Sequence, residues 1–257
     1  MRIATFNANS IRSRMPILVD WLAKQSPDIL CVQETKVQDP DFPIEPIQDA
    51  GYEVVFKGQK SYNGVAILSK HKPDEVASGF TDKGPADDTR FIRARFGKLW
   101  IVNTYVPQGR EIDHEMYEYK QAWFKRLRTF FDKEFKTSDL LLWTGDLNVA
   151  REPIDVSDPE KKKKHVCYHA DVRKVFEKCL EWGFVDIFRK YHPEAGQFSF
   201  YDYRQFGGIE SGKGWRIDYI LVSPALAKLA TDSFIDLEPR KLPKPSDHTF
   251  MVADFDL

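Results

Sequence analysis

Four short polar segments interrupt the apolar pattern of this chain, and each follows an apolar run or lies inside one. They are residues 5–9, 33–36, 144–148 and 246–248. In an extended backbone, residues two apart point to the same side, so Asp146 and Asn148 share a face. The same spacing joins Asn7 and Asn9. We therefore expect acids, amides and one histidine to meet at the ends of strands.

These side chains are of the kinds that bind a hard divalent cation and a phosphate. Carboxylate and amide oxygens suit Mg²⁺, and a histidine can donate a hydrogen bond to a phosphoryl oxygen. Taken singly, Glu34 is better interpreted as a solvated acid at a strand end, and Asp146 or Asn148 as the cap of a turn. Because the segments are spread from residue 5 to residue 248, convergence in one site is the leading hypothesis.

Two of the segments suggest specific chemistry. Asp146 follows an apolar run and the turn-forming Gly145, where its carboxylate can orient and deprotonate a water molecule. The side-chain amide of Asn148 can donate to a phosphate oxygen. A lone histidine is more often structural, but Asp218 can pair with His248, raise its pKa and hold it as a donor.

Composition limits the classes of protein to consider. With 257 residues, 42% of them hydrophobic and 30% charged, the chain is typical of a globular protein. Its net charge of −1 means that any contact with a polyanion depends on local patches. The three cysteines, at positions 31, 167 and 179, predict buried free thiols in a reducing compartment. Without a signal sequence or a long apolar run, we expect a cytoplasmic protein that does not contact membranes.

The spacing of apolar residues predicts about ten strands and three long helices. The strands are expected at residues 3–6, 29–32, 53–56, 65–68, 91–96, 100–105, 140–143, 198–201, 217–222 and 250–255. The helices are expected at residues 11–22 with Ser10 as N-cap, at 116–135, and at 172–180 before Gly183. So strand-rich a pattern favours an α/β fold of two packed mixed β-sheets flanked by helices. No low-complexity linker divides residues 1–257, which predicts a single domain.

Four irregular stretches, rich in Pro, Gly, Asp and Lys, are expected to border the site. They are residues 36–50, 106–115, 151–168 and 202–216. One of them contains the run Lys161 to Lys164, which fits a solvated loop and a phosphate contact equally well.

Six motifs, in order over essentially the whole chain, carry a family resemblance. They are Gln-Glu-Thr-Lys at 33–36, Tyr-Val-Pro-Gln-Gly at 105–109, Gly-Asp-Leu-Asn-Val-Ala at 145–150, Phe-Tyr-Asp-Tyr-Arg at 200–204, Gly-Trp-Arg-Ile-Asp-Tyr at 214–219 and Ser-Asp-His at 246–248. The chain resembles the exonuclease III-type AP endonucleases of the endonuclease/exonuclease/phosphatase superfamily. The last two motifs recur across that superfamily, including its lipid phosphatases. The motifs at 33–36, 105–109 and 200–204 favour its DNA-repair branch.

The resemblance implies a four-layer, DNase I-like α/β sandwich and a phosphodiester hydrolase. Its implied activity is Mg²⁺-dependent hydrolysis of DNA on the 5′ side of an abasic nucleotide, with Mn²⁺ able to substitute. It also implies 3′-phosphodiesterase activity and a variable degree of 3′–5′ exonuclease activity. We expect a monomer that acts on double-stranded DNA carrying abasic sites or blocked 3′ ends.

The resemblance also assigns roles position by position. The implied metal ligands are Glu34 and Asp247, with Asn9 beside them. The implied catalytic residues are Asp146, Asn148, His248, Tyr105, Asp218 and Asn7. Phe200, Trp215 and Ile217 resemble the pocket for the flipped-out abasic sugar, and Gln108, Arg110 and Arg216 are expected near the DNA. In some relatives Asn9 is replaced by Asp, so this chain has one negative charge fewer for a second metal.

Within the catalytic set, the implied roles differ. Asp146 activates water and is held by Asn7, while Asn148 contacts the phosphate or the leaving oxygen. Tyr105 offers its phenol to the phosphate. His248, paired with an acid, stabilises the transition state.

Other functions share parts of this pattern. A phosphatase or sphingomyelinase on the same scaffold would keep Glu34, Asp146, Asn148 and the Asp247-His248 pair. A non-catalytic DNA-binding module would have lost at least one hydrophilic residue of the set, and all are present. Direct incision beside deoxyuridine depends on loop details and stays open.

Overall fold

The computed structural model describes residues 1–204 and 208–257, which contain twelve strands and seven α-helices. The strands are β1 (Arg2–Asn7), β2 (Ile29–Gln33), β3 (Glu53–Lys57), β4 (Val65–Ser69), β5 (Glu75–Ser78), β6 (Phe91–Phe96), β7 (Leu99–Tyr105), β8 (Leu140–Asp146), β9 (Val185–Asp186), β10 (Asp218–Val222), β11 (Ala230–Asp236) and β12 (Phe250–Phe255). The helices are α1 (Ile11–Gln25), α2 (Glu45–Asp49), α3 (Glu115–Glu134), α4 (Pro159–Lys162), α5 (Ala170–Leu180), α6 (Ile187–Tyr191) and α7 (Pro224–Ala227).

The strands form two mixed sheets of six strands each. One has the order β11-β12-β1-β2-β4-β3 and the other the order β5-β6-β7-β8-β10-β9. The pairs β1–β2 and β7–β8 are parallel, and the remaining pairs are antiparallel. The predicted α/β fold with two mixed sheets is therefore confirmed.

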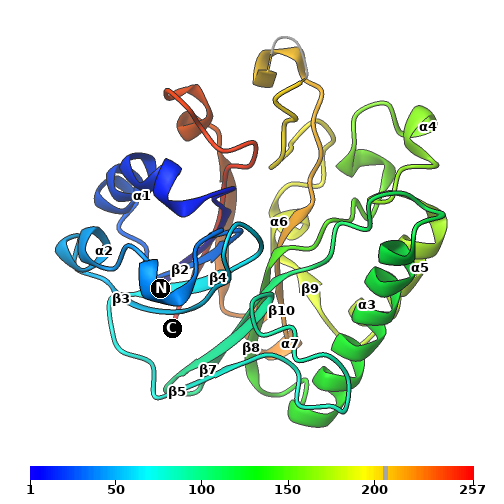
Figure 1. Cartoon of the computed structure of the whole chain (residues 1–257). Helices are drawn as coiled ribbons and strands as arrows, with labels where there is room; N and C mark the ends of the chain where they lie inside the picture. Colours follow the sequence, from blue (N-terminus) through cyan, green and yellow to red (C-terminus); the bar gives the residue numbers. More distant parts are fainter. Residues whose placement is uncertain (205–207) are drawn as a thin grey trace.

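Helices cover the outer faces of the two sheets (Figure 1). Helices α1 and α2 lie beside the first sheet, and α3 and α5 lie beside the second. The apolar stripe of α3 explains its position, because Trp123, Leu127 and Phe131 are fully buried against that sheet. In α1, Leu18 and Leu22 do the same. The result is the four-layer sandwich that we expected.

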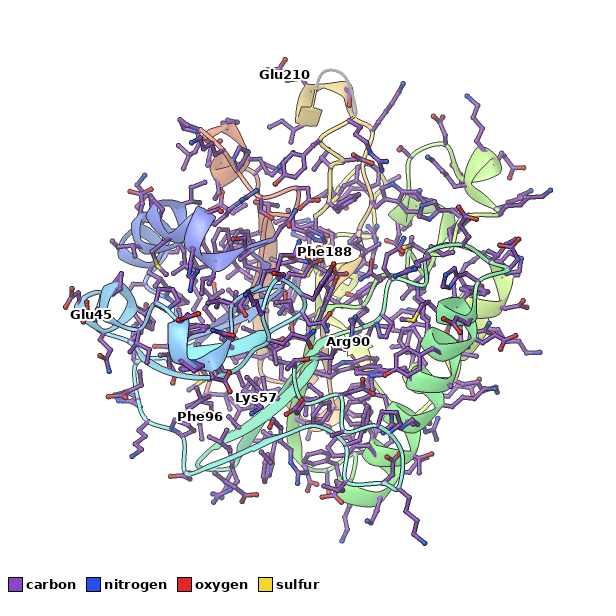
Figure 2. All side chains as sticks on the ribbon, viewed as in Figure 1. Glu45, Lys57, Arg90, Phe96, Phe188 and Glu210 are labelled. Atoms are coloured by element: carbon purple, nitrogen blue, oxygen red, sulfur yellow. The ribbon has the colours of Figure 1, made fainter. Side chains whose placement is uncertain are left out.

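A continuous apolar core lies between the two sheets. It includes Ile3 and Ile67 from one sheet and Ile101 and Ile220 from the other. Side chains fill this space, and Phe188 of α6 lies among them (Figure 2). Burying each aliphatic side chain of this size stabilises the fold by about 1.5–3 kcal/mol. The sheets are thus fixed face to face, which fixes the relative position of their ends.

Strand direction brings the polar segments to one end of the sandwich. Asn7 ends β1, Tyr105 ends β7 and Asp146 ends β8, and Tyr105 lies directly opposite Asp146 in the parallel pair. Strand β10 runs the other way and begins at Asp218, opposite Asp146. Strand β12, antiparallel to β1, begins shortly after His248. Helix α4 and the described parts of the segment between α6 and β10, residues 192–204 and 208–217, extend beyond the sheets at the top of the view (Figure 1).

Some predicted elements differ from the structure. Residues 198–201 form no strand; Phe200 makes only isolated bridges to Trp215 and His248. Strands β5, β9 and β11 were not predicted. Ser10 occupies the N-cap position of α1, but its side chain makes no capping hydrogen bond. Part of the expected border loop 202–216, residues 205–207, lies outside the described residues.

Two smaller predictions can also be checked. All three cysteines are buried and free, as expected. Among the described helices, none combines the length and the apolar character needed to cross a membrane.

Candidate active site

A cavity of about 590 Å³ opens at the end of the sandwich where the polar segments meet. Residues from both sheets and from the border loops line it. The predicted site residues among them are Glu34, Tyr105, Gln108, Asp146, Asn148, Phe200, Trp215, Ile217, Asp247 and His248. Asn7 and Asp218 lie behind this lining and bond to it. The predicted convergence of distant segments is thus present in the fold.

Asp146 is held rigidly at the bottom of the cavity. Its Oδ2 accepts a hydrogen bond from Asn7 Nδ2 at 2.8 Å, and its Oδ1 accepts one from the backbone N–H of Asn148 at 2.9 Å. The same Asn7 Nδ2 lies 3.1 Å from Glu34 Oε1. One amide therefore fixes two carboxylates relative to each other.

A glycine makes this arrangement possible at the end of β8. Gly145 has φ +133°, and a Cβ atom there would lie 1.9 Å from the carbonyl oxygen of Thr104. Only glycine allows β7 and β8 to approach so closely at this point. Asn148, two residues beyond Asp146, adopts a left-handed backbone with φ 51°. The turn places the Asp146 carboxylate and the Asn148 side chain on the cavity.

His248 and Asp218 form a buried pair next to Asp146. His248 Nδ1 lies 2.8 Å from Asp218 Oδ2, and its Nε2 lies 3.7 Å from Asp146 Oδ2. Ser199 Oγ also donates to Asp218 Oδ2, at 2.6 Å. Burial alone would lower the pKa of His248, but the carboxylates of Asp218 and Asp146 outweigh it and raise the pKa to about 10. His248 is therefore a cation at neutral pH.

The pKa of Asp146 is also raised, which for a carboxyl group favours the neutral form. Burial raises its pKa to about 7; the His248 cation opposes this change, and the carboxylates of Asp218 and Glu34 add to it. A carboxylate with a pKa near neutrality is suited to accept a proton from water. The site thus places a carboxylate suited to act as a general base beside a cationic donor.

Tyr105 completes this part of the cavity. Its side chain lies beside Glu34, and the Arg90 guanidinium lies 4.8 Å from its ring centroid. Burial and the neighbouring Glu34 carboxylate raise the pKa of the phenol well above its ordinary value. The phenol keeps its proton and can donate a hydrogen bond into the cavity.

The predicted metal ligands lie in a second network of oxygens and one ammonium group. Lys36 Nζ lies 2.7 Å from Glu34 Oε2 and also donates to Asn9 Oδ1. Asn9 Nδ2 in turn donates to Asp247 Oδ1 at 3.0 Å. Burial alone would raise the pKa of Glu34, but the Lys36 ammonium outweighs it and lowers that pKa. The Glu34 and Asn9 oxygens thus already bind the Lys36 ammonium, and the carboxylate oxygens of Glu34 and Asp247 suit a hard metal ion.

A second group of side chains also has the spacing of a metal site. Ligand atoms of Asp146, Asp218 and His248 lie within 4.8 Å of one another, a grouping that could hold a metal ion. However, His248 Nδ1 already bonds to Asp218, and a protonated imidazole is not a metal ligand. That cation offsets one of the two carboxylate charges there. The donor set around Glu34 and Asp247 therefore fits a metal better.

The expected sugar pocket forms one wall of the cavity. Phe200, Trp215 and Ile217 all line it, as predicted. The backbones of Phe200 and Trp215 bond to each other in both directions, at 2.8 and 2.9 Å. His165, which was not predicted, packs its ring against Trp215 with centroids 4.6 Å apart. Backbone hydrogen bonds therefore join Phe200 to Trp215, and the His165 ring, which also lines the cavity, packs against the indole.

The residues expected near DNA separate into two groups. Gln108 lines the cavity, and Arg110 is exposed beside it, outside the lining. From the lysine run, Lys161 and Lys162 line the cavity, whereas Lys163 pairs with Glu160 at 2.6 Å.

The prediction for Arg216 was wrong. This side chain is 0% exposed, and its Nε bonds to Asp155 Oδ1 at 2.8 Å. Its Nη2 lies 2.8 Å from Asp186 Oδ2. In this short segment neighbouring side chains point to opposite sides, so Trp215 and Ile217 line the cavity while Arg216 points into the protein. Its burial between two acids leaves no surface for DNA.

Three further groups support the site without having been predicted. Ser246 Oγ donates to the carbonyl of Asn7 at 2.7 Å and accepts from the backbone N–H of His248. Ser199 holds Asp218. Lys120 of α3 bonds to the carbonyl of Asn148 from below. Ser246 belongs to the Ser-Asp-His motif, and Lys120 is a lysine within an apolar helical stripe, so both had a sequence signal; Ser199 had none.

Comparison with known proteins identifies the family. The sequence pattern of the Endonuclease/Exonuclease/phosphatase family matches residues 4–248. The chain belongs to this family. Among curated relatives, the exodeoxyribonuclease III of Haemophilus influenzae is 34% identical over 99% of this chain and 100% of its own length.

Solved structures of family members agree with this assignment. An AP endonuclease from Archaeoglobus fulgidus is 50% identical, with a TM-score of 0.98 and full coverage of both chains. A 3′ phosphatase from Neisseria, solved with a product DNA hairpin, is 37% identical with a TM-score of 0.92, again over both full chains. The family members similar to this chain over their whole length thus include nucleases and a DNA 3′ phosphatase.

Proposed function

We propose that the protein is a DNA-repair nuclease that hydrolyses the phosphodiester on the 5′ side of abasic sites. We further propose 3′-phosphodiesterase activity and some 3′–5′ exonuclease activity. The observation that carries the proposal is a shared cavity. It joins the Asp146 base and the His248 cation to an apolar wall of Phe200, Trp215 and Ile217. A phosphate and a sugar without its base would occupy those two parts.

In the proposed mechanism, the residues act on the phosphate from several sides. Asp146, held by Asn7 at 2.8 Å, takes a proton from the attacking water. Protonated His248 donates to a phosphoryl oxygen as negative charge develops, while Asp218 keeps the imidazole charged.

Two further donors complete the proposed phosphate site. The Asn148 amide uses one N–H on the carbonyl of Val106 at 3.1 Å, which leaves the other for the phosphate or the leaving oxygen. The second proposed donor is the Tyr105 phenol, which is protonated at neutral pH and lines the same cavity. Both groups are fixed before substrate arrives, which limits reorganisation during the reaction.

The proposed cofactor is Mg²⁺, with Mn²⁺ able to substitute. Glu34 and Asp247 would hold it, with Asn9 beside them. Lys36 contacts Glu34 and Asn9, and the Asn9 amide donates to Asp247, so one hydrogen-bonded network already joins the three. When bound, the metal would neutralise charge on the phosphoryl oxygens. The single acid pair supports one metal rather than two, because Asn9 adds no charge.

The proposed substrate is double-stranded DNA with abasic sites or blocked 3′ ends. We propose that the protein acts on it as a monomer and that residues 1–257 form one catalytic domain. An abasic sugar leaves the duplex cheaply and fits a small apolar pocket, whereas an intact nucleotide brings a bulky base. Exposed Arg110 and the cavity-lining Gln108, Lys161 and Lys162 supply polar contacts at the rim. The similarity to a 3′ phosphatase solved with DNA supports a nucleic-acid substrate.

The test is cleavage of end-labelled duplexes that carry an abasic-site analogue, a uracil, or neither, with and without Mg²⁺. The proposal predicts rapid Mg²⁺-dependent incision of the abasic duplex alone. A soluble phosphoinositide, offered in parallel, separates this function from that of a lipid phosphatase. Release of phosphate from the lipid, with no DNA cleavage, would contradict the proposal.

A further inference from the structure

Lys120 is a buried cation directly beneath the cavity. It lies on the inner face of α3 with Tyr117, Trp123 and Phe124, and its side chain is 0% exposed. Lysine is almost never fully buried unless it is paired with an acid. Within the described part of the chain, no ion pair joins Lys120 to a carboxylate. Its place in an apolar stripe therefore calls for another explanation.

The ammonium group of Lys120 bonds to three backbone carbonyls. Its Nζ lies 3.0 Å from Gln108 O, 2.6 Å from Asn148 O and 2.9 Å from Val166 O. These carbonyls belong to three separate loops that border the cavity. An ammonium has three N–H donors, so all of them are used. One side chain therefore ties the loop that follows β7 to two points of the connection between β8 and α5.

The hydrogen bond to Asn148 holds a residue whose backbone conformation is strained and whose side chain lines the cavity. Asn148 has a left-handed backbone with φ 51°, which non-glycine residues adopt only at a cost. Its carbonyl points down to Lys120, and its side chain lies on the cavity. Without Lys120, that buried carbonyl would lose its hydrogen bond to the ammonium group. Rotation of the peptide would then turn the Asn148 amide away from the phosphate.

We propose that Lys120 is a positioning residue for phosphodiester cleavage, acting through the Asn148 loop. This inference rests on the proposed function. A neutral apolar side chain would pack on this face of α3 without the cost of burying a charge. The lysine thus stabilises the conformation of the loops whose carbonyls it binds, rather than the packing of α3. Its loss should slow the chemical step more than it weakens DNA binding.

The test uses Lys120→Met, which keeps the length of the side chain and removes its charge and donors. The single-turnover rate of incision of an abasic-analogue duplex is measured at saturating enzyme, where an unfolded fraction does not change the rate constant. The Kd for the same duplex is measured by fluorescence anisotropy in EDTA. We expect the rate to fall by ~10²-fold, as small displacements of reacting groups do, with a much smaller change in Kd.

Two matched controls lie on the same helix. Leu127→Ala removes a fully buried side chain of α3 that belongs to the apolar core, and Lys125→Met removes an exposed lysine. Both should keep the wild-type single-turnover rate. If Lys120→Met matches the wild-type rate as well, the lysine only stabilises the fold, and the inference is overturned.

A double-mutant cycle tests the route of the effect. If Lys120 acts through Asn148, the pair Lys120→Met with Asn148→Ala should be no slower than Asn148→Ala alone. Multiplied losses in the double variant would show an independent role and contradict the proposal. If the Met variant does not fold, Lys120→Gln enters the same cycle with the same expectations. Inactivity of the wild-type protein on abasic DNA would instead refute the proposed function.

Discussion

The Nδ1 atom of His248 lies 2.8 Å from Oδ2 of Asp218, and neither side chain is more than 5% exposed. A buried imidazole facing a carboxylate favours its charged form. Asp218→Asn removes that charge, so the imidazolium loses its main stabilising partner and the pKa of His248 should fall from about 10. In a single-turnover pH profile, the descending limb should move to lower pH.

The ascending limb of the profile gives a second check on this prediction. Its position is set by Asp146, whose pKa lies at about 7 and which must lose its proton to act as a base. The rate should therefore rise with pH through this region in both proteins. Removing Asp218 should also move this limb slightly downward, since a neighbouring negative charge is lost. A descending limb that stays in place would mean that His248 does not titrate in the reaction.

Glu34→Gln tests the metal site. A neutral amide binds a cation more weakly than a carboxylate, so this variant should need more Mg²⁺ for half-maximal activity, while saturating Mg²⁺ restores part of the rate. The measurement is a Mg²⁺ titration of incision, starting from protein treated with EDTA. The control variant Glu181→Gln changes an exposed glutamate, and in the same titration it should need as much Mg²⁺ as the wild type. An unchanged Mg²⁺ requirement in Glu34→Gln would make Glu34 a strand-end acid without a metal role.

Trp215→Ala tests the sugar pocket. The indole is 8% exposed and forms part of the cavity wall, so its removal should open space beside the reacting phosphate. We expect the variant to fold and to lose discrimination between abasic and intact DNA by ~10-fold or more, because size exclusion is relaxed. The ratio of kcat/KM for the two duplexes measures this. Trp100→Ala, on β7 outside the cavity lining, should keep the ratio. If both variants keep the wild-type ratio of kcat/KM, Trp215 does not contribute to the discrimination between abasic and intact DNA.

Gly145→Ala tests the close approach of β7 and β8. The new Cβ atom would lie 1.9 Å from Thr104 O, so the strand ends must separate. The free energy of unfolding should fall by roughly 3 kcal/mol or more, as strain and lost bonds add up. Gly97 is a matched control with φ +59° and open space around its Cβ position, and Gly97→Ala should cost only about 1 kcal/mol. Urea denaturation compares the two, and equal losses would show that the close approach carries no extra strain.

The sequence predicted the convergence of the site because its polar segments follow apolar runs or lie inside them, which puts their side chains at strand ends. In the structure, Tyr105 and Asp146 end the parallel strands β7 and β8 of one sheet, and the packing of the two sheets brings them to Asn7 at the end of β1 in the other. The apolar stripes that predicted α1, α3 and α5 are long enough to show a period clearly. The short edge strands β5 and β9 carry too few apolar residues to show one.

Side-chain direction within a motif was harder to predict. Arg216 lies between two pocket residues, and its sequence neighbours did not show that Asp155 and Asp186 enclose it. These acids are 61 and 30 positions away, so the contact depends on the tertiary fold. Lys120 did carry a local signal, as a lysine three positions before Trp123 in an apolar stripe. That signal showed burial but not which carbonyls the ammonium meets.

The central claim is that Asp146 activates water for attack on the phosphate 5′ to an abasic sugar. Incision of an abasic-analogue duplex in H₂¹⁸O, followed by mass spectrometry of the fragments, tests it most directly. The account predicts one ¹⁸O atom in a new 5′-phosphate and an unlabelled 3′-hydroxyl. It also predicts a rate at least ~10²-fold lower for Asp146→Asn with similar DNA affinity. Products without ¹⁸O in the phosphate, or an Asp146→Asn protein as fast as the wild type, would contradict it.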